Sequence, residues 1–229
     1  MRTLRRILCG ILLVLFLVST FSFVLDIQPV NGNETVNQTI YINADGTVDP
    51  PTVPIQRNGD LYTLTSNITI DAHPGIRIMK DNVTLDGAGF TIQYPVRGTP
   101  EYFPATGIYL HEVKNVTVKN VGLANYYYEG ILLDGKSVNN RMIRNNIFFR
   151  GLGIRFEKEA SNNSLIGNTI WGGYRYMQGA ILVRSSSNYL YENRIAFSSI
   201  FSAYFGISFT DNSSFNAIVR NDLHTPVLL

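Results

Sequence analysis

This 229-residue chain contains only one cysteine. That residue, Cys9, lies in the apolar stretch near the N-terminus. No disulfide bond can therefore hold the rest of the chain together. The sequence also contains no phosphate-binding glycine loop, no nucleophile elbow and no calcium-binding nonapeptide repeat. Its acidic residues are scattered singly, whereas a glycosidase needs two carboxylates about 5–9.5 Å apart on one face. These absences leave no motif that predicts catalysis.

An excess of charge of either sign is also missing. From residue 33 onward, 16 Lys and Arg residues balance 16 Asp and Glu residues. A net charge near zero argues against a nucleic-acid partner, which needs a basic surface. The charges are unevenly distributed, however, since residues 33–129 carry 6 basic and 10 acidic groups and residues 130–229 carry 10 and 6. The C-terminal part is thus the basic part.

The first 32 residues have the pattern of a targeting segment. Arg2, Arg5 and Arg6 precede a charge-free, mainly apolar run over residues 7–25. This order is typical of a secretory signal peptide, and residues 30–32 offer a cleavage site. The run is also long enough to span a bilayer, so an uncleaved membrane anchor is the alternative. In both cases we expect an extracellular or cell-surface protein that meets the membrane only through this segment.

One short pattern recurs through the C-terminal half. A strand with the sequence Gly-Ile or Ala-Ile begins at Gly130, Gly153, Ala180 and Gly206, with spacings of 23, 27 and 26 residues. Each strand is followed by a polar turn and then by Asn-x-x-apolar-x-Asn-x-apolar, as in NRMIRNNI over residues 140–147. Alternating apolar and polar residues indicate β-strands. A repeat of this length with such alternation predicts a β-solenoid.

Stacking of coils explains which residues recur. A single coil cannot bury its own apolar positions, so Ile131 and Ile154 are expected to lie above one another in parallel strands about 4.8 Å apart. Glycine at the strand entry permits a positive φ or a close approach of two backbones. Asparagine tolerates the left-handed backbone of a sharp bend, and its amide can hydrogen-bond to the next coil. We therefore predict two asparagine ladders: Asn140, Asn163, Asn188 and Asn216, and Asn145, Asn168, Asn193 and Asn221.

The pattern extends towards the N-terminus. Residues 75–92 and 107–121 add two coils, which makes about six. Residues 33–74 do not repeat, and we interpret them as strands and loops that cap the first coil. The sequence therefore predicts an all-β fold with a signal or anchor helix over residues 1–32, a cap over residues 33–74 and parallel β-helix repeats over residues 75–229. No charged strand or capping helix is predicted after the last coil.

These motifs resemble a known family. The opening NVTLDGAGFTI of residues 82–92, the GI-x-L strands and the Ser/Asn turns resemble the right-handed, single-stranded, pectin-lyase-like parallel β-helix of the NosD-like and CASH group, the carbohydrate-binding proteins and sugar hydrolases. The leader and the stretch IYINADGTVDPP are similar to those of exported archaeal β-helix proteins. The resemblance covers residues 75–225 and implies the fold. Members of the group include lyases, glycosidases, epimerases, adhesins and an accessory protein of copper-site assembly, so it implies no single function.

Copper, which the NosD name implies, prefers imidazole and sulfur ligands. Beyond the leader the sequence offers only a few of these, and they are widely separated: His73, His111, His224, Met79, Met142 and Met177. They form no spaced motif, so we predict no metal and no other cofactor.

Aromatic residues recur in the segment that follows each Asn-x-apolar strand. Equivalent segments of a solenoid lie above one another, so these rings are expected on one flank. Tyrosine and tryptophan present flat apolar faces with polar edges, which suit a sugar. The alternative is that the rings, above all the phenylalanines, extend the core. The candidate carbohydrate-binding residues are Tyr126, Tyr128, Glu129, Trp171, Tyr174, Arg175, Tyr176 and Tyr204.

Three functions remain open. We expect a non-catalytic exported protein that binds a polysaccharide or another surface polymer along the aromatic flank. The second hypothesis is a structural or adhesive module that self-associates through its uncapped C-terminal coil. The third is a relative of polysaccharide lyases or hydrolases, so enzymatic activity is an open question. Among the Asn-x-Ser/Thr sequons, Asn33 and Asn37 in the polar lead-in are the glycosylation candidates.

Overall fold

The structure is a computed structural model that describes residues 34–95, 105–126, 128–172, 177–197, 203–211 and 213–224. Within these ranges the chain forms 24 β-strands. None of the described residues belongs to a helix that could cross a membrane. The predicted signal or anchor segment of residues 1–32 and the candidate glycosylation site Asn33 lie outside these ranges.

The strands form three eight-stranded sheets, named A, B and C here. Sheet A contains β1 (Glu34–Val36), β6 (Ile68–Ile70), β9 (Thr91–Gln93), β12 (Gly122–Tyr126), β15 (Asn146–Phe149), β18 (Thr169–Gly172), β21 (Arg194–Phe197) and β24 (Asp222–His224) in spatial order. Sheet B contains β3 (Val48–Asp49), β2 (Ile40–Ile42), β7 (Ile76–Ile78), β10 (Thr106–His111), β13 (Glu129–Asp134), β16 (Leu152–Phe156), β19 (Met177–Val183) and β22 (Ala203–Phe209). Sheet C contains β4 (Ile55–Asn58), β5 (Leu61–Leu64), β8 (Thr84–Asp86), β11 (Thr117–Lys119), β14 (Arg141–Ile143), β17 (Ser164–Ile166), β20 (Tyr189–Tyr191) and β23 (Ala217–Val219).

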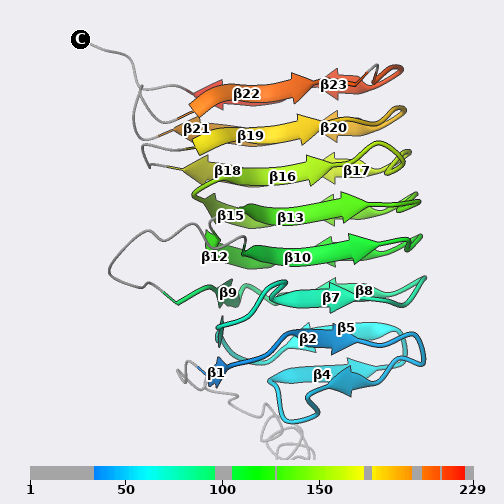
Figure 1. Cartoon of the computed structure of the whole chain (residues 1–229), viewed down its shortest axis with the longest axis vertical. Helices are drawn as coiled ribbons and strands as arrows, with labels where there is room; N and C mark the ends of the chain where they lie inside the picture. Colours follow the sequence, from blue (N-terminus) through cyan, green and yellow to red (C-terminus); the bar gives the residue numbers. More distant parts are fainter. Residues whose placement is uncertain are drawn as a thin grey trace, which may run out of the picture. The chain divides into compact units, whose positions relative to one another are not determined.

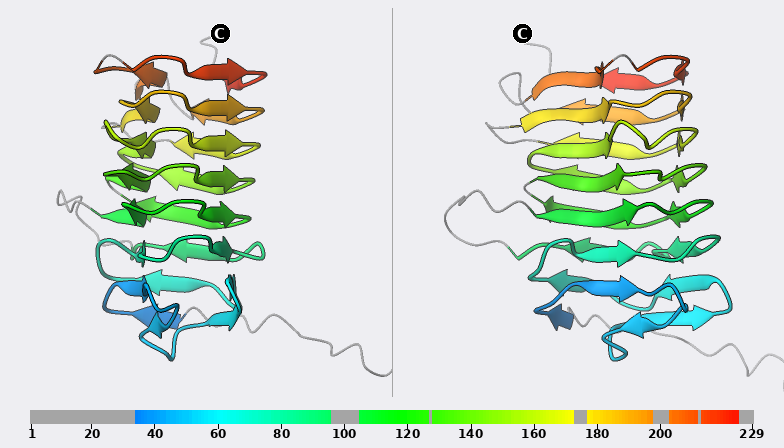
Figure 2. Two further views of the ribbon diagram at one scale, coloured as in Figure 1. Left: turned by 90° about the vertical axis from the view of Figure 1, so that its right-hand side faces the viewer. Right: turned by 45° about the vertical axis from the view of Figure 1, so that its right-hand side comes forward.

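Successive strands pass from sheet B to sheet C to sheet A, and the resulting coils stack along one axis (Figures 1 and 2). Coil 1 consists of β7, β8 and β9, and the following triplets form coils 2 to 6, which end with β22, β23 and β24. Neighbouring coils pair in parallel in all three sheets. The predicted all-β fold, a parallel β-helix of about six coils, is therefore confirmed.

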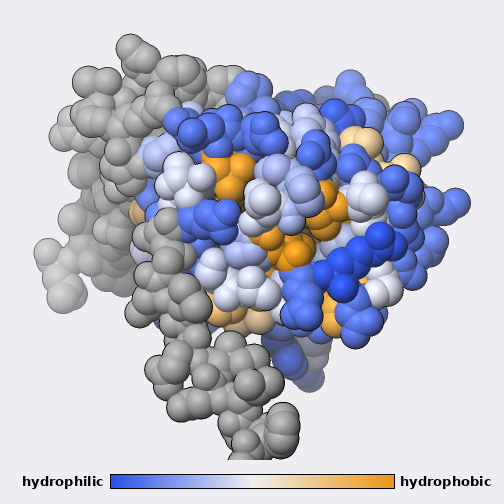
Figure 3. Space-filling model, turned by 90° about the horizontal axis from the view of Figure 1, so that it is seen from below, coloured by the Kyte–Doolittle hydropathy of each residue, from blue (hydrophilic) through white to orange (hydrophobic). Residues whose placement is uncertain are grey.

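The segment before coil 1 adds a parallel layer of strands and two antiparallel ones. β2, β5 and β6 pair in parallel with the three strands of coil 1. β3 and β4 pair antiparallel with β2 and β5, and therefore occupy the outer edges of sheets B and C. Seen from this end, the surface is mostly hydrophilic, with a few hydrophobic side chains near its middle (Figure 3).

The core consists of columns of aliphatic residues inside the coils. Along sheet B the in-register isoleucines are Ile76, Ile108, Ile131, Ile154, Ile181 and Ile207. The first five have no solvent exposure, whereas Ile207 in coil 6 is partly buried. The same change occurs in sheet A, where Ile195 is fully buried and its coil 6 neighbour Leu223 is 51% exposed. Each coil thus buries the interior of the coil beneath it.

The predicted asparagines form two columns that connect the coils. The Oδ1 atom of Asn163 accepts a hydrogen bond from the backbone N–H of Asn140 at 2.8 Å, and its Nδ2 atom donates to the carbonyl of Ser137 at 2.9 Å. In the second column, side chains also bond directly to one another, with Asn145 donating to Asn168 at 3.0 Å. The contacts continue upward through Asn188, Asn193, Asn216 and Asn221. Below coil 3, the columns continue with valines at Val116 and Val121, whose backbone N–H groups bond to the first asparagine of each ladder.

The left-handed backbone positions are separate from the ladders. In coils 3 and 4 the residues with φ near +58° are Asn139 and Asn162, each directly before a ladder asparagine. At the second bend the corresponding residues are Arg144 and Gly167. The sequence interpretation assigned both tasks to asparagine without distinguishing the positions. In the structure these two tasks belong to different residues. One residue adopts the left-handed turn, and the buried asparagine after it forms the hydrogen bonds to the backbone of the adjacent coil.

Candidate functional site

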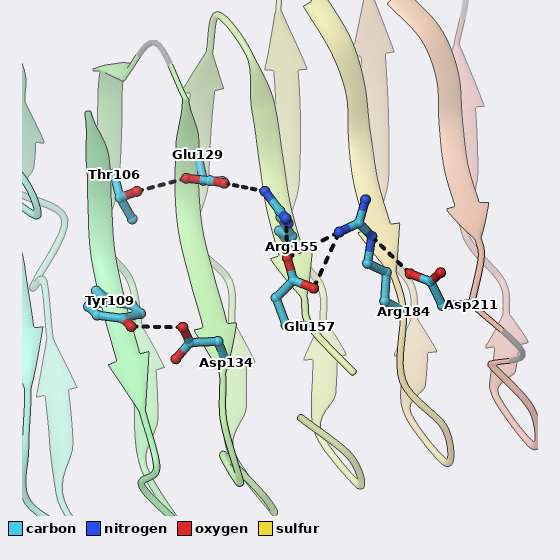
Figure 4. Close-up of polar contacts among 8 residues, drawn as sticks. All are labelled: Thr106, Tyr109, Glu129, Asp134, Arg155, Glu157, Arg184 and Asp211. Carbon is cyan, nitrogen blue, oxygen red and sulfur yellow. Dashed lines mark hydrogen bonds and ion pairs between the residues drawn. The ribbon is translucent and has the colours of Figure 1, made fainter. Parts of the chain in front are cut away.

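A row of charged and polar side chains crosses several coils of sheet B, from the buried Thr106 and Glu129 to Asp211 in coil 6 (Figure 4). Glu129 on β13 accepts a hydrogen bond from the hydroxyl of Thr106 on β10 at 2.7 Å, and one from the guanidinium of Arg155 on β16 at 3.0 Å. Arg155 also forms an ion pair with Glu157. Burial raises the pKa of Glu129, although the Thr106 hydroxyl and the charge of Arg155 act in the opposite direction.

The row continues towards coil 6. Glu157 lies 3.4 Å from the Nη1 atom of Arg184, and the Nε atom of Arg184 lies 3.3 Å from the carboxylate of Asp211. Opposite charges therefore alternate along the stack. Because each carboxylate is paired with an arginine, the ion pairs of this row link neighbouring coils to one another.

A second polar cluster lies at the far ends of β10 and β13. The Asp134 carboxylate accepts a hydrogen bond from the hydroxyl of Tyr109 at 2.8 Å, and its other oxygen lies 2.5 Å from Nδ1 of His111. The guanidinium carbon of Arg77 lies 5.2 Å from the centroid of the Tyr109 ring. Burial, followed by the hydrogen bond and charge of Asp134, raises the pKa of Tyr109 to about 12.

The outer face of sheet A carries the exposed aromatic pair. Trp171 on β18 is 40% exposed, and its ring centroid lies 4.2 Å from that of Phe148 on β15 at an interplanar angle of 33°. The indole N–H donates to the Oδ1 atom of Asn146 at 2.9 Å. Above and below the pair, the in-register residues are Ala196 and Ala124. Small side chains therefore bracket the two rings.

A polar row runs beside the aromatic pair. It consists of Asn146, Thr169 and Arg194, which are in register on β15, β18 and β21. These residues stand two positions before the ring-bearing column and so face the same side of the sheet. Sheet A thus presents flat apolar rings next to amide, hydroxyl and guanidinium groups.

Two predicted ligand contacts lie in the interior. Tyr126 has no solvent exposure, because a bulge between Ala124 and Tyr126, where Asn125 has φ of +66°, shifts it into register with the buried Phe149. Its ring occupies the space next to Gly107, where a Cβ would lie 3.1 Å from the ring. The expectation that Tyr126 contacts a ligand is therefore wrong. Glu129 is also fully buried, and the row in sheet B occupies its carboxylate.

The other predicted contacts have different locations. Tyr128 is 38% exposed and directly precedes Glu129 at the start of β13, so it lies beside the sheet B row. Trp171 is on sheet A. The remaining candidates Tyr174, Arg175 and Tyr176 lie outside the described residues, as does the side chain of Tyr204. The four described candidates, Tyr126, Tyr128, Glu129 and Trp171, therefore do not form one column.

The sequence reasoning missed the sheet B row and the ring beneath Trp171. The signal for the row was present in the strand endings GIYLH, GILLD, GIRFE and AILVR. Aligned on their Ile positions, these endings place His111, Asp134, Glu157 and Arg184 in one column, with two acidic residues between a histidine and an arginine. The alternative that the phenylalanines extend the core describes Phe149, whereas the alternation of the strand turns the neighbouring Phe148 outward against Trp171.

The residues that the structure describes do not fit a copper site. Among the described residues, no three His, Cys, Asp or Glu side chains converge in a way that could hold a metal ion. His111 is hydrogen-bonded to Asp134, and His224 lies 2.6 Å from Asp222 in coil 6. Met142 is fully buried in the core.

The stacked three-sheet coils define a parallel β-helix protein. The family described as "Periplasmic copper-binding protein (NosD)" matches residues 30–226 of the chain. The chain therefore belongs to the NosD family. Searches of curated proteins and of solved structures gave no match.

Proposed function

We propose that this chain is an exported, non-catalytic β-helix protein of the cell envelope that binds an extended glycan across the outer face of sheet A. The observation that carries the proposal is the exposed Trp171 ring, which packs on Phe148 at 4.2 Å and is fixed by its hydrogen bond to Asn146. The description of the family as periplasmic supports the exported location.

The arrangement suits a sugar for a simple reason. Pyranose rings have apolar C–H faces and polar edges, so they bind to a flat aromatic face with hydrogen-bonding groups at its side. Ala196 adds little bulk beside Trp171, and Thr169 supplies a hydroxyl two positions away on the same strand. Because Asn146 fixes the indole, little conformational entropy is lost on binding.

The non-catalytic part of the proposal is supported by the state of the carboxylates on sheet B. Glu129 and Glu157 both contact Arg155, which lies between them. A glycosidase needs one carboxylic acid and one free carboxylate across the scissile bond. Glu129 has no solvent exposure, so its carboxyl group is not presented to a substrate, and Arg155 pairs with Glu157.

The test compares two exposed aromatic residues on different sheets. Trp171→Ala should weaken the affinity of the full chain for a bound polysaccharide by roughly tenfold, about 1.4 kcal/mol. The matched control is Tyr189→Ala on sheet C, which is 38% exposed and stacks on Tyr191 with 5.6 Å between centroids. Affinity electrophoresis against soluble polysaccharides provides the measurement. Equal affinities of the two variants, or no retention by any polysaccharide, would refute the proposal.

A second candidate function is self-association through coil 6. Ile218 and Leu223, each 51% exposed, continue columns whose members in coil 5 are fully buried. Two such surfaces would bury one another's apolar side chains. The test is sedimentation of the full chain over a range of concentrations, with Leu223→Arg as the disrupting variant. A chain that stays monomeric at all concentrations would exclude this candidate.

A further inference from the structure

Two arginines bring positive charge to the polar row beside Trp171: Arg194 within the row and Arg144 at the bend before Asn146. Arg194 is exposed and in register with Thr169, and Ala196 on the same strand is in register with Trp171. From strand spacing and rise, the Cα atoms of Arg194 and Trp171 are about 8 Å apart on one face. An arginine side chain spans that distance.

Arg144 lies in coil 3, at the bend two positions before Asn146. It makes the left-handed turn directly before Asn145, and β15 begins with Asn146. Its Cγ atom lies 3.6 Å from the position that a Cβ on Gly167 would occupy, so its side chain extends towards the coil that carries Trp171. Because Gly167 has no side chain, nothing of that residue separates Arg144 from the start of β18.

The acidic side chains of coils 3 to 5 are engaged elsewhere. Among the described residues, Glu129 and Glu157 pair with Arg155, and Asp134 contacts His111. Glu159 lies in the turn after sheet B, and Glu192 lies 3.6 Å from Arg220. No ion pair within the described ranges involves Arg144 or Arg194. Asp222 on β24 follows Arg194 in register, and its carboxylate lies 2.6 Å from Nε2 of His224. Arg144 and Arg194 therefore add positive charge to the polar row beside Trp171.

We infer that the glycan bound at sheet A is anionic and bears carboxylate or sulfate groups, which Arg144 and Arg194 bind while a sugar ring covers Trp171. This inference rests on the proposed function and adds the chemical class of the ligand. Guanidinium groups bind carboxylate and sulfate oxygens through paired hydrogen bonds. Neighbouring acidic sugars would also engage the two arginines at once, which raises avidity along a polymer.

Matched ligands separate charge from sugar shape. Dextran sulfate is compared with dextran, and polygalacturonate with its fully methyl-esterified form. We expect the full chain to bind at least one charged polymer more tightly than its neutral counterpart, and added salt to reduce the difference. The pair that shows the difference identifies sulfate or carboxylate as the recognised group. Equal binding of charged and neutral polymers would overturn the inference.

Two arginine variants test whether the preference for a charged polymer arises at sheet A. Arg194→Gln should weaken binding of the charged polymer roughly threefold to tenfold and leave binding of its neutral counterpart unchanged. Arg141→Gln on sheet C, which removes the same charge from an exposed strand position, is the control and should change neither. Equal effects of the two changes would refute the inference, whereas the proposed function would still stand if Trp171→Ala weakened binding of both polymers.

Discussion

The guanidinium of Arg155 lies 3.0 Å from the carboxylate of Glu129, whose side chain has no solvent exposure. Taking a carboxylate out of water costs several kcal/mol unless a partner and hydrogen bonds compensate. Here Arg155 and Thr106 provide that compensation, yet burial still raises the pKa of Glu129. The ion pair therefore connects β13 to β16, and its contribution to the free energy of unfolding depends on pH.

The variant Glu129→Gln should reveal how the free energy of unfolding depends on the protonation of Glu129. A raised pKa means that folded Glu129 keeps its proton to higher pH than the unfolded chain, whose value is near 4.5. The stability that this proton contributes is complete below pH 4.5 and is lost as the pH rises through the pKa of the folded state. Relative to Glu129→Gln, the wild-type free energy of unfolding should therefore fall as the pH increases above 4.5.

Urea unfolding at a series of pH values measures this difference, and subtraction of the two proteins cancels the other titrating groups. Glu159→Gln, in an exposed turn, is the control for removing a carboxylate from the surface. A wild type that gains stability relative to Glu129→Gln between pH 4.5 and 7 would contradict the assignment.

The asparagine ladder makes a prediction about two adjacent residues. Asn163 is buried and satisfies the backbone N–H of Asn140 and the carbonyl of Ser137. Asn163→Ala leaves both groups without that partner, which should cost about 2–4 kcal/mol. Asn162 next to it is exposed with φ of +57°, so Asn162→Gly should change stability by less than about 1 kcal/mol. Denaturant unfolding of both variants checks this, and similar losses at the two positions would argue against the division of tasks.

A close approach of backbones explains the glycine at the start of the sheet B strands. A Cβ on Gly153 would lie 2.6 Å from the carbonyl oxygen of Ala180 and 2.6 Å from Cγ2 of Ile170. Gly153→Ala should therefore separate coils 4 and 5 locally and cost about 1–3 kcal/mol. In coil 5 the same position is Ala180, which is buried, so the reverse change Ala180→Gly should cost under about 1 kcal/mol. Thermal unfolding compares the two, and an unaffected Gly153→Ala variant would show that the coils can separate freely.

The fold was accessible from the sequence because each of its main contacts repeats. The period fixes which isoleucines stack, and the asparagine positions fix where coils bond to one another. The aromatic surface was less accessible, because a single bulge at Asn125 turns Tyr126 inward and into register with Phe149. Nothing in the local sequence distinguishes that bulge from one more strand residue. The sheet B row was hidden for another reason, since its partners lie 23–27 residues apart and become adjacent only when the repeats are aligned.

The phenol of Tyr109 provides a last test of the polar clusters on sheet B. Its pKa is raised to about 12, first by burial and then by the hydrogen bond and charge of Asp134. A phenol with a raised pKa stabilises the fold fully below pH 10, the value for an unperturbed tyrosine, and this contribution is lost as the pH rises towards 12. The difference in ultraviolet phenolate absorbance between wild type and Tyr109→Phe should therefore appear near pH 12. Asp134→Asn removes the negative charge beside the hydroxyl and should move that transition to lower pH. A transition at pH 10 in the wild type, or one that Asp134→Asn leaves in place, would show that Asp134 does not hold the proton on Tyr109.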